Sequence, residues 1–485
     1  MEPVSAEPWP EDLDPETTRA AFKAYDIRGI AGDPLTASFA LRLGRATATF
    51  LDCDALAVCR DIRESGPELH AAFVEGLLAS GVDVHDIGIM PTGALYRATL
   101  ALDVDGGVAI TASHNPPEYN GFKFCRGPDA MAGDELQELW SVFEAGEFRD
   151  GVGEHIEIDD FLDLYFDAII DSAGIPERRV RLVIDSGNAV PGPYIEALVR
   201  LLGADATCIL CEWDNSYPVH PPDPTRPANM ELLGEVVVET GAEFGIGIDG
   251  DGDRIGMVDE QGRFVDPDRI LALFADDVLS RVPDDASDEA RTIIYDVKCS
   301  LALEQVIENG GGIPHMMRTG HSFQKLALKR SPEVQLAGEM SGHFFFNDRW
   351  SGHDDSLYCV ARMLELVGRD PAPDDGGPEF SERMAAFPTY PSTGEGKVPL
   401  MAEREETMTF VADAFSDLPC VTVDGIRARF AGDDWEGWFL CRPSNTEPIL
   451  VMRAEATSEA GLQTIKDEVE RRLGERIELD RFHNG

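Results

Sequence analysis

Short strand-like apolar segments alternate with segments of helical periodicity, and this alternation limits the chain to a small set of folds. Strand patterns at residues 55–59, 82–87 and 106–110 are separated by helical patterns, and the same order begins again at 180–184 and at 292–295. Strands that alternate with helices of roughly 10 to 15 residues predict mainly parallel sheets with helices on both faces. The sequence therefore predicts three related α/β domains.

The pattern changes to α+β from residue 379 onward and ends with an amphipathic helix at 459–473. A chain of 485 residues is also too long for a single hydrophobic core. We therefore expect four domains. Their predicted bounds are 1–160, which includes a polar leader at 1–17, then 161–266, 267–376 and 377–485.

The chain carries far more acidic than basic residues, 90 Asp and Glu against 41 Lys and Arg, which gives a formal net charge of -49. Such a charge repels nucleic acid and anionic membranes, so we expect no partner of either kind. The acidic first segment is unlike a secretory signal. Dispersed acidic residues with only seven lysines suit a salt-rich cytoplasm, where a short Debye length screens the repulsion. We therefore predict a halophilic, cytoplasmic protein.

Nine cysteines are scattered along the chain, and only Cys208 and Cys211 lie close together. These two fall in a strand-like run, where residues three apart point to opposite faces. No second Cys-x-x-Cys is present to complete a zinc site. We therefore interpret the cysteines as reduced structural thiols.

Ser113 follows the strand-like segment 106–110 in the run Thr-Ala-Ser-His-Asn-Pro-Pro, and the two prolines prevent a helix or central strand from continuing. A hydroxyl on such a stiff loop can act as a nucleophile or carry a phosphoryl group. His114 and Lys123 supply nearby proton-transferring or positive groups. The alternative for this run alone is an Asn-Pro turn with a solvated serine.

The segment 245–254 places Asp249, Asp251 and Asp253 at alternate positions among glycines. Three carboxylates on a flexible backbone can converge on a hard divalent cation, and they leave room for a phosphate oxygen, so the pattern favours magnesium. A calcium-binding hand is disfavoured because Arg254 occupies the position that needs glycine and both flanks are strand-like. An acidic hairpin without a metal is the remaining alternative.

Two further loops suit sugar and phosphate recognition. Glu339 and Ser341, two residues apart between glycines, can accept from and donate to neighbouring sugar hydroxyls, but a surface turn is the better explanation of this segment taken alone. Residues 442–448 combine a guanidinium with hydroxyl and amide groups, which can form a phosphate cradle without a metal. An ordinary turn is the alternative for this second loop.

Together these segments resemble the α-D-phosphohexomutase superfamily, in particular its bacterial-type phosphomannomutase/phosphoglucomutase branch. The motifs that carry the resemblance are Phe-Lys-Ala-Tyr-Asp-Ile-Arg-Gly at 22–29, Thr-Ala-Ser-His-Asn-Pro at 111–116, Asp-Gly-Asp-Gly-Asp-Arg at 249–254, Gly-Glu-Met-Ser-Gly-His at 338–343 and Arg-Pro-Ser-Asn-Thr at 442–446. The resemblance implies an α/β fold of four domains, in which three related domains with mainly parallel sheets precede a C-terminal α+β domain.

The resemblance also implies a role for each motif. Ser113 would be the phosphoserine, and its phosphate would bind the metal together with Asp249, Asp251 and Asp253. Arg254 would stabilise the transferring phosphoryl group, while Lys123 and His114 would act as acid–base groups, with the pKa of Lys123 expected to be lowered by neighbouring cations. The residues implied to bind substrate are Tyr25, Arg28, Lys298, His321, Glu339, Ser341, His343, Arg442, Ser444, Asn445 and Thr446.

The implied enzyme is an isomerase that interconverts hexose 1-phosphate and hexose 6-phosphate, with mannose, glucose or both as the sugar. Phosphoserine would give its phosphoryl group to the substrate, and the resulting 1,6-bisphosphosugar would return the other phosphate to Ser113. The implied cofactors are Mg²⁺ and, as activator and intermediate, glucose 1,6-bisphosphate or mannose 1,6-bisphosphate. The partners would be small hexose phosphates, and the chain would act as a monomer.

Three other functions are open at this stage. Met340 favours a mannose or glucose enzyme over a phosphoglucosamine mutase, which tends to have glutamine there. A metal-dependent sugar-phosphate phosphatase would pass the phosphoryl group to water, and a sugar-phosphate sensor would not need all the reactive residues. Four residues depart from the common family pattern: Ala189, Ser356, Pro443 and Glu447.

Overall fold

The computed structural model describes residues 6–400, 402–444 and 448–483. Contacts divide the chain into two compact units. Unit 1 comprises residues 1–267, 325–332 and 341–383, and unit 2 comprises residues 268–324, 333–340 and 384–485. Across the described ranges, no helix combines the length and the apolar character needed to cross a membrane.

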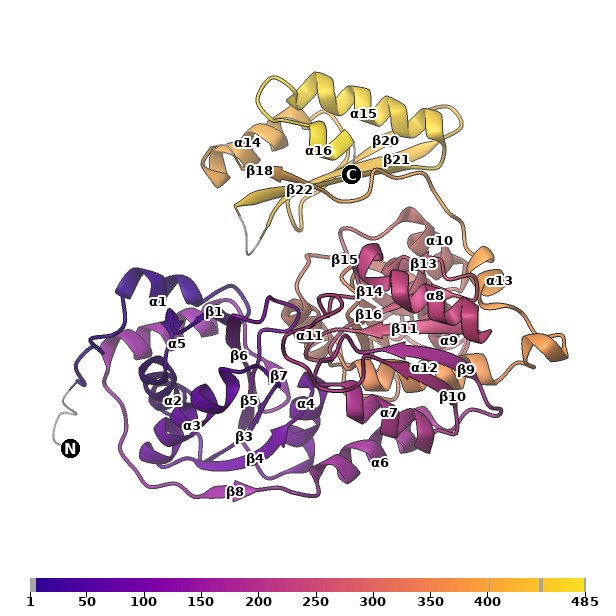
Figure 1. The fold of residues 1–485 in the computed structure, drawn as a ribbon. Helices are drawn as coiled ribbons and strands as arrows, with labels where there is room; N and C mark the ends of the chain where they lie inside the picture. The colour runs from indigo at the N-terminus through magenta and orange to yellow at the C-terminus, as the bar shows by residue number, and fades with distance from the viewer. Residues whose placement is uncertain (1–5, 401, 445–447, 484–485) are drawn as a thin grey trace. The chain divides into compact units, whose positions relative to one another are not determined.

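The first sheet of unit 1 has eight strands in the order β2-β1-β6-β5-β3-β4-β8, with β7 paired to β6 (Figure 1). Its strands are β1 (Ile27–Ala31), β2 (Pro34–Leu35), β3 (Ala55–Arg60), β4 (Asp83–Ile89), β5 (Gly106–Ile110), β6 (Tyr119–Arg126), β7 (Asp129–Ala130) and β8 (His155–Glu157). The pairs β3–β4, β3–β5 and β4–β8 are parallel, while β6 runs antiparallel to both β5 and β1. The predicted parallel sheet is therefore present, with an antiparallel strand added beside β5.

Helices pack on this sheet, and buried aromatic side chains fill the space between the helices and the sheet. The helices that belong to this part of the chain are α1 (Pro15–Ala21), α2 (Ala37–Leu51), α3 (Gly66–Ala79), α4 (Thr92–Ala101) and α5 (Asp134–Ala145). Phe39 of α2, Phe73 of α3, Phe122 of β6 and Phe143 of α5 are fully buried and belong to one hydrophobic cluster. Burial of these side chains fixes β5 and β6, and hence the loop after β5 that carries Ser113 and the strand β6 that carries Lys123.

The second sheet of unit 1 has the order β10-β9-β11-β12-β13. Its strands are β9 (Arg181–Asp185), β10 (Asp205–Ile209), β11 (Phe244–Ile248), β12 (Ile255–Asp259) and β13 (Phe264–Val265). Pairing is parallel from β10 to β11 and antiparallel from β11 to β13. Every residue of β11 and β12 is buried, so the turn between them, residues 249–254, is held at the end of a rigid hairpin.

Unit 2 contains two sheets of different kinds. Strands β14 (Thr292–Asp296), β15 (Ile313–Met317) and β16 (Leu336–Gly338) pair in parallel in the order β15-β14-β16. The C-terminal sheet is antiparallel, in the order β18-β22-β21-β20-β19. Its strands are β18 (Gly396–Pro399), β19 (Cys420–Val421), β20 (Ile426–Ala431), β21 (Glu436–Pro443) and β22 (Ile449–Ala456).

The C-terminal sheet is covered by α15 (Glu459–Leu473), which runs along one face in Figure 1. Its buried residues Leu462, Ile465, Val469 and Leu473 recur every three or four positions, so the apolar side of the helix faces the sheet.

The other helices are α6 (Phe161–Ala173), α7 (Gly192–Leu201), η1 (Pro227–Met230), α8 (Glu231–Thr240), α9 (Pro267–Leu279), α10 (Leu301–Asn309), α11 (His321–Arg330), α12 (Ser356–Gly368), η2 (Pro373–Asp375), α13 (Phe380–Ala385), α14 (Arg404–Ala414) and α16 (Asp480–His483). The remaining strand is β17 (Phe344–Phe346).

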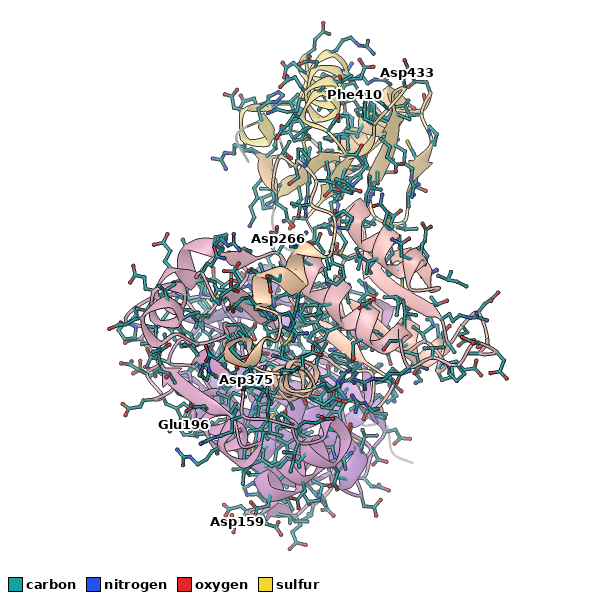
Figure 2. The ribbon with its side chains drawn as sticks, turned by 90° about the vertical axis from the view of Figure 1, so that its right-hand side faces the viewer. Asp159, Glu196, Asp266, Asp375, Phe410 and Asp433 are labelled. Carbon is teal, nitrogen blue, oxygen red and sulfur yellow. The ribbon has the colours of Figure 1, made fainter. Side chains whose placement is uncertain are left out.

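The predicted fold class is confirmed: three α/β regions built on mixed sheets with parallel cores precede an antiparallel α+β region. The four domain boundaries stay predictions. Acidic side chains are dispersed over the surface, as the exposed Asp159, Glu196, Asp375 and Asp433 illustrate in Figure 2.

The interpretation of Cys208 and Cys211 as residues on opposite strand faces is wrong. Strand β10 ends at Ile209, and Leu210 has a positive φ of 48°, so the chain turns before Cys211. Cys211 therefore lies beyond the strand, and its thiol donates to the Ile209 carbonyl at 3.3 Å. Period-two alternation applies only while the backbone stays extended.

Candidate active site

Ser113 lies three residues beyond β5, on a loop supported by a buried arginine. The Arg63 guanidinium donates from Nη2 to the carbonyls of Ser113 and Asn115, at 2.7 Å each. Its Nη1 donates to the carbonyls of Pro116 and Tyr119. Four carbonyls of one loop are therefore tied to one rigid group, and the loop gains the stiffness expected from its prolines.

The Ser113 side chain is buried and points at the acidic turn between β11 and β12. Its Oγ donates to Asp249 Oδ2 at 2.8 Å and lies 3.0 Å from His114 Nδ1. The backbone of Ser113 has a φ of 52°, a left-handed conformation that costs free energy in a residue other than glycine. The surrounding hydrogen bonds hold this conformation, and the role of Ser113 as a nucleophile stays a prediction.

The acidic turn is organised by Asp249. Its Oδ1 accepts hydrogen bonds from the backbone N–H groups of Gly252, Asp253 and Arg254, at 3.0 to 3.1 Å. Gly250 is required by the close approach of the serine loop, because a Cβ at this position would lie 2.2 Å from the Ser113 carbonyl oxygen. The turn and the serine loop are therefore in direct backbone contact.

Lys123 on β6 lies between the other two aspartates. Its Nζ donates to Asp251 Oδ2 at 2.5 Å and to Asp253 Oδ2 at 2.6 Å. Thr92 Oγ1, at the start of α4, also donates to Asp251 Oδ2. All of these groups are buried, so their charges interact strongly.

Burial acts to lower the pKa of Lys123, but Asp251 and Asp253 outweigh it and hold that pKa well above its usual value. The expectation of a lowered pKa is therefore wrong for this arrangement, because the nearest charges are carboxylates and not cations. Burial, together with the charges of Asp253 and Asp251, raises the pKa of Asp249. Burial and then Arg254 lower the pKa of His114, which keeps its imidazole neutral.

The three aspartates fit a divalent cation. One oxygen of each carboxylate lies within 4.8 Å of the others, and all three residues are buried. Asp251 Oδ1 is buried and makes no hydrogen bond to any described residue. A buried carboxylate oxygen without a donor is costly, and a cation would satisfy it. Asp249, Asp251 and Asp253 are the residues that would hold Mg²⁺, whose positive charge would stabilise phosphoryl oxygens on Ser113.

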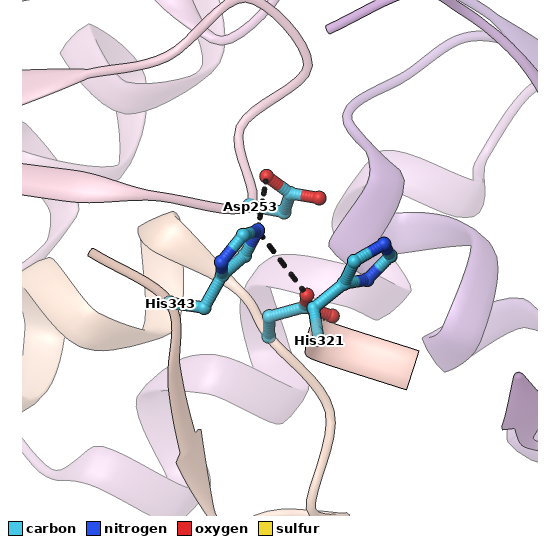
Figure 3. Close-up of side chains that lie close together, drawn as sticks. Asp253, His321 and His343 are labelled. Carbon is cyan, nitrogen blue, oxygen red and sulfur yellow. Dashed lines mark ion pairs between the residues drawn. The ribbon is translucent and has the colours of Figure 1, made fainter. Parts of the chain in front are cut away.

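Arg254 and His343 border the same cluster. Arg254 Nε lies 3.2 Å from His343 Nε2 and 3.7 Å from Asp249 Oδ2. His343 Nε2 lies 3.4 Å from Asp253 Oδ1, and Figure 3 shows this ion pair. The other ring nitrogen, His343 Nδ1, hydrogen-bonds to Ser341 Oγ at 2.9 Å. Two residues of the predicted sugar loop therefore belong to the surroundings of the acidic turn.

Arg28, on β1, contacts the serine loop from the other side. Its Nη1 donates to Asn115 Oδ1 at 2.7 Å, and its Nη2 donates to Asp26 Oδ2. Tyr25 precedes this strand and is half-buried. The predicted substrate-binding motif at residues 22–29 is thus joined to the serine loop through Arg28.

Unit 2 carries a second group of predicted residues, arranged around Asp296 at the end of β14. Asp296 Oδ1 accepts from the backbone of Met340, and its Oδ2 accepts from Thr319 Oγ1. Glu339 Oε1 accepts from the backbone N–H of Gly320 at 2.5 Å. His321, also predicted to bind substrate, is buried at the first position of α11.

Lys298 belongs to the same group. Its Nζ lies 3.1 Å from Glu395 Oε1 and 3.8 Å from Asp296 Oδ2. Burial acts to lower the pKa of Lys298, but these two carboxylates outweigh it and raise the pKa. Arg453 on β22 donates to the Lys298 carbonyl at 3.0 Å and fixes the loop.

Arg442, the next-to-last residue of β21, belongs to the same group. Its Nε donates to Asp424 Oδ2 at 2.8 Å, and the same oxygen accepts from the backbone N–H of Thr319 at 3.0 Å. Within the described ranges, Arg442 Nη2 is buried and has no hydrogen-bond partner. Ser444 donates its backbone N–H to the Ile449 carbonyl. The predicted ligands Asn445 and Thr446, and the variant position Glu447, lie outside the described residues.

Sequence reasoning missed four residues that support these sites: Arg63, Thr92, Asp223 and Asp424. Asp223 follows Pro222, whose carbonyl accepts a hydrogen bond from the backbone N–H of Gly250 in the acidic turn. Arg63 follows Arg60 and Asp61, which end a predicted strand, and this position in the sequence could have identified Arg63 as a candidate site residue. Thr92, Asp223 and Asp424 carry no local signal, because their partners are far away in the sequence.

The variant residue Ser356 begins α12 and donates its backbone N–H to the Gly252 carbonyl of the acidic turn.

The sequence matches family models for all four domains of the phosphoglucomutase/phosphomannomutase family. Alpha/beta/alpha domains I, II and III match residues 19–150, 162–262 and 266–389, and the C-terminal domain matches residues 397–472. The chain therefore belongs to the phosphoglucomutase/phosphomannomutase family.

Individual relatives agree over almost the whole chain. A phosphomannomutase/phosphoglucomutase of Pseudomonas putida is 40% identical over 453 residues, which cover 92% of this chain and 94% of the relative. A phosphoglucomutase of Neisseria gonorrhoeae is 39% identical, covering 93% and 96%. A crystal structure of a family protein from Burkholderia thailandensis superposes with a TM-score of 0.85 at 39% identity, covering 94% and 97%. The predicted family and enzyme class are confirmed.

Proposed function

We propose that this chain interconverts hexose 1-phosphates and hexose 6-phosphates of mannose, glucose or both, through a phosphorylated Ser113 and a 1,6-bisphosphosugar intermediate. The observation that carries the proposal is the direct hydrogen bond of 2.8 Å between Ser113 Oγ and Asp249, inside a cluster of three aspartates, Lys123 and Arg254. A buried hydroxyl beside this many charges has no evident structural purpose, whereas phosphoryl transfer needs all of them.

Each residue near Ser113 has a distinct role in this proposal. The Ser113 oxygen carries the phosphoryl group to be transferred, and Arg254 balances the negative charge that develops on its oxygens. His114, with a neutral ring 3.0 Å from Ser113 Oγ, can accept or return the hydroxyl proton. Lys123 holds Asp251 and Asp253 in place and is the second candidate for proton transfer.

Residues of each unit supply substrate recognition in this proposal. Glu339 of unit 2 carries a buried carboxylate that can accept from sugar hydroxyls, and Ser341 of unit 1 supplies a hydroxyl from the same sequence motif. Arg442, whose Nη2 is buried without a partner among the described residues, is suited to bind the phosphate that does not react. Ser444, Asn445 and Thr446 would complete this phosphate site. Lys298 and His321 are further candidates for substrate binding in unit 2, and Tyr25 and Arg28 are candidates in unit 1.

A bisphosphosugar is needed because Ser113 must be phosphorylated before the first turnover. We propose glucose 1,6-bisphosphate or mannose 1,6-bisphosphate as this activator.

The nine cysteines are free thiols, which suits a reducing cytoplasm. Strong mutual repulsion between chains of net charge -49 supports a monomer, which sedimentation at several protein concentrations would test.

The decisive experiment follows phosphorus by NMR while the protein acts on the 1-phosphates of mannose, glucose and glucosamine, each supplied separately. The mixtures contain magnesium, molar potassium chloride and a trace of glucose 1,6-bisphosphate. We expect mannose and glucose 1-phosphates to become 6-phosphates. Conversion of glucosamine 1-phosphate alone would indicate a phosphoglucosamine mutase. Free phosphate as the main product would indicate a phosphatase and contradict the proposal.

A further inference from the structure

A short proline-rich segment of unit 1, residues 220–224, packs directly on the hairpin that ends in the acidic turn. Its sequence is His-Pro-Pro-Asp-Pro. A Cβ added to Gly256 of β12 would lie 2.2 Å from the Pro224 carbonyl oxygen, and a Cβ added to Gly247 of β11 would lie 3.0 Å from the Pro224 Cβ. The glycines of the hairpin therefore leave the room that this segment occupies.

The segment also contacts the acidic turn itself. The Pro222 carbonyl accepts from the backbone N–H of Gly250 at 3.2 Å. Gly250 separates Asp249 from Asp251, and it is the residue whose backbone closely approaches the Ser113 carbonyl. The position of the Pro222 carbonyl therefore helps to set where the turn lies relative to Ser113.

His220 anchors the start of the segment. Its Nε2 lies 3.0 Å from Oδ2 of Asp185, the last residue of β9, and its Nδ1 lies 2.9 Å from the Pro221 carbonyl oxygen. The His220 side chain is 14% exposed. The Pro221 carbonyl belongs to the peptide bond that leads into Pro222. The ring therefore joins the end of β9 to the residue that holds Gly250.

Both contacts of the ring require a donor. A carbonyl oxygen and an ionised carboxylate can only accept, so both ring nitrogens of His220 carry a proton and the ring is an imidazolium. The hydrogen bond to Asp185 raises the pKa of His220, against the opposing effect of burial. Among the described residues, Asp185 is the only charged group that pairs with the ring. Gly187, whose added Cβ would lie 3.6 Å from the ring, carries no charge.

We propose that His220 is a positioning residue for the acidic turn, because it binds Asp185 and the Pro221 carbonyl at once and so places the Pro222 carbonyl that holds Gly250. The inference rests on the proposed function, in which this turn is the metal site. A neutral ring has one N–H and can donate to only one of the two oxygens. The turn is therefore held firmly while His220 is protonated and less firmly as pH rises through the pKa of His220.

The test measures magnesium binding to the resting full-length protein by titration calorimetry, for the wild type and for His220→Gln, at several pH values. At about pH 6 the variant should bind magnesium roughly 10-fold more weakly, as expected for a residue that supports metal ligands. The difference should shrink as pH rises, because the wild-type ring then becomes neutral as well. Equal binding at the lowest pH would overturn the proposal. A deficit of the same size at every pH would also overturn it, since a purely structural role has no such pH dependence.

His155→Gln is the matched control. His155 lies on β8 of the first sheet and pairs through Nε2 with Asp86 Oδ2, also at 3.0 Å. This variant removes a histidine–aspartate pair of the same kind and should bind magnesium like the wild type at every pH. Weakening equal to that of His220→Gln would contradict a specific role for His220.

A second measurement needs only the wild-type protein, so it decides the question even if a variant fails to fold. In metal-free protein, the NMR signals of the His220 ring and of the Gly250 amide should shift with the same pKa, because one contact chain joins them. Independent titrations would contradict the proposal. Neither measurement depends on turnover. A protein without mutase activity would therefore contradict the proposed function and leave the test of His220 intact.

Discussion

The acidic cluster of unit 1 and the phosphate-site candidate of unit 2 leave opposite kinds of buried groups unsatisfied. Around Ser113, three aspartates face Lys123 and Arg254, and the buried Asp251 Oδ1 accepts no hydrogen bond from a described residue. In unit 2, the buried Arg442 Nη2 donates to none of the described residues. A lone acceptor attracts a cation and a lone donor attracts an anion, so the contrast agrees with the proposal of a metal at the first site and a phosphate at the second.

The two clusters also differ in how their charges are restrained. In unit 1 the aspartates are fixed by backbone N–H groups and by Lys123, so the site is organised before a ligand binds. In unit 2 the Asp424 carboxylate holds both Arg442 and the backbone of Thr319. A bound phosphate would have to share Arg442 with Asp424. The first cluster is therefore suited to chemistry and the second to recognition.

The largest effect should come from Ser113→Ala. Removing the hydroxyl removes the phosphoryl carrier, so mutase turnover should fall by about 1,000-fold or more, while hexose phosphate binding stays close to that of the wild-type protein. Steady-state rates and binding calorimetry measure the two quantities. Ser141→Ala, at an exposed helix position, is the control. Equal losses of turnover and binding would contradict the role of Ser113 as the nucleophile.

A smaller but specific effect should come from Asp251→Asn. The substitution halves the charge that Lys123 bridges and weakens one metal ligand, so the magnesium concentration for half-maximal activity should rise by roughly 10- to 100-fold. Magnesium titration calorimetry on the resting protein provides a readout independent of activity. Asp205→Asn changes an exposed carboxylate on β10 and should behave like the wild-type protein. A magnesium titration identical to that of the wild type would rule out Asp251 as a ligand.

Arg442→Gln should change recognition more than chemistry. Losing one charge-assisted hydrogen bond to phosphate should raise KM for hexose phosphate by about 10-fold, with a smaller change in kcat. Arg429→Gln is a matched control, because Arg429 lies on the neighbouring strand β20 and is exposed. A fall in kcat at unchanged KM would mean that Arg442 takes part in the reacting site and would remove the distinction between the two clusters.

The smallest effect on the two sites should come from salt, which acts mainly on surface charge. Molar potassium chloride should screen the repulsion among exposed carboxylates and raise the free energy of unfolding, whereas the buried aspartates are shielded from it. Urea unfolding at low and at molar salt measures the difference. Greater stability at low salt would contradict the prediction of a halophilic protein.

Local pattern predicted much of the fold. Strand β11 and helices α10 and α15 lie where periodicity and breaker residues place them, at 244–248, 301–309 and 459–473. The pattern could not show that the chain turns at Leu210, because nothing in an apolar run of this length marks a left-handed residue other than glycine. Because the chain turns there, Cys211 lies beyond the strand that carries Cys208.

The sequence by itself determined the chemical groups: a serine beside prolines, three aspartates among glycines, an arginine followed by polar residues, and the order in which strands and helices carry them. These features depend on residue type and short-range spacing. Tertiary structure alone decided which groups meet, since Ser113 and Asp249 are separated by 136 residues. It also decided that Lys123 lies between carboxylates, which raises its pKa, because a charge responds to its neighbours in space and not in sequence.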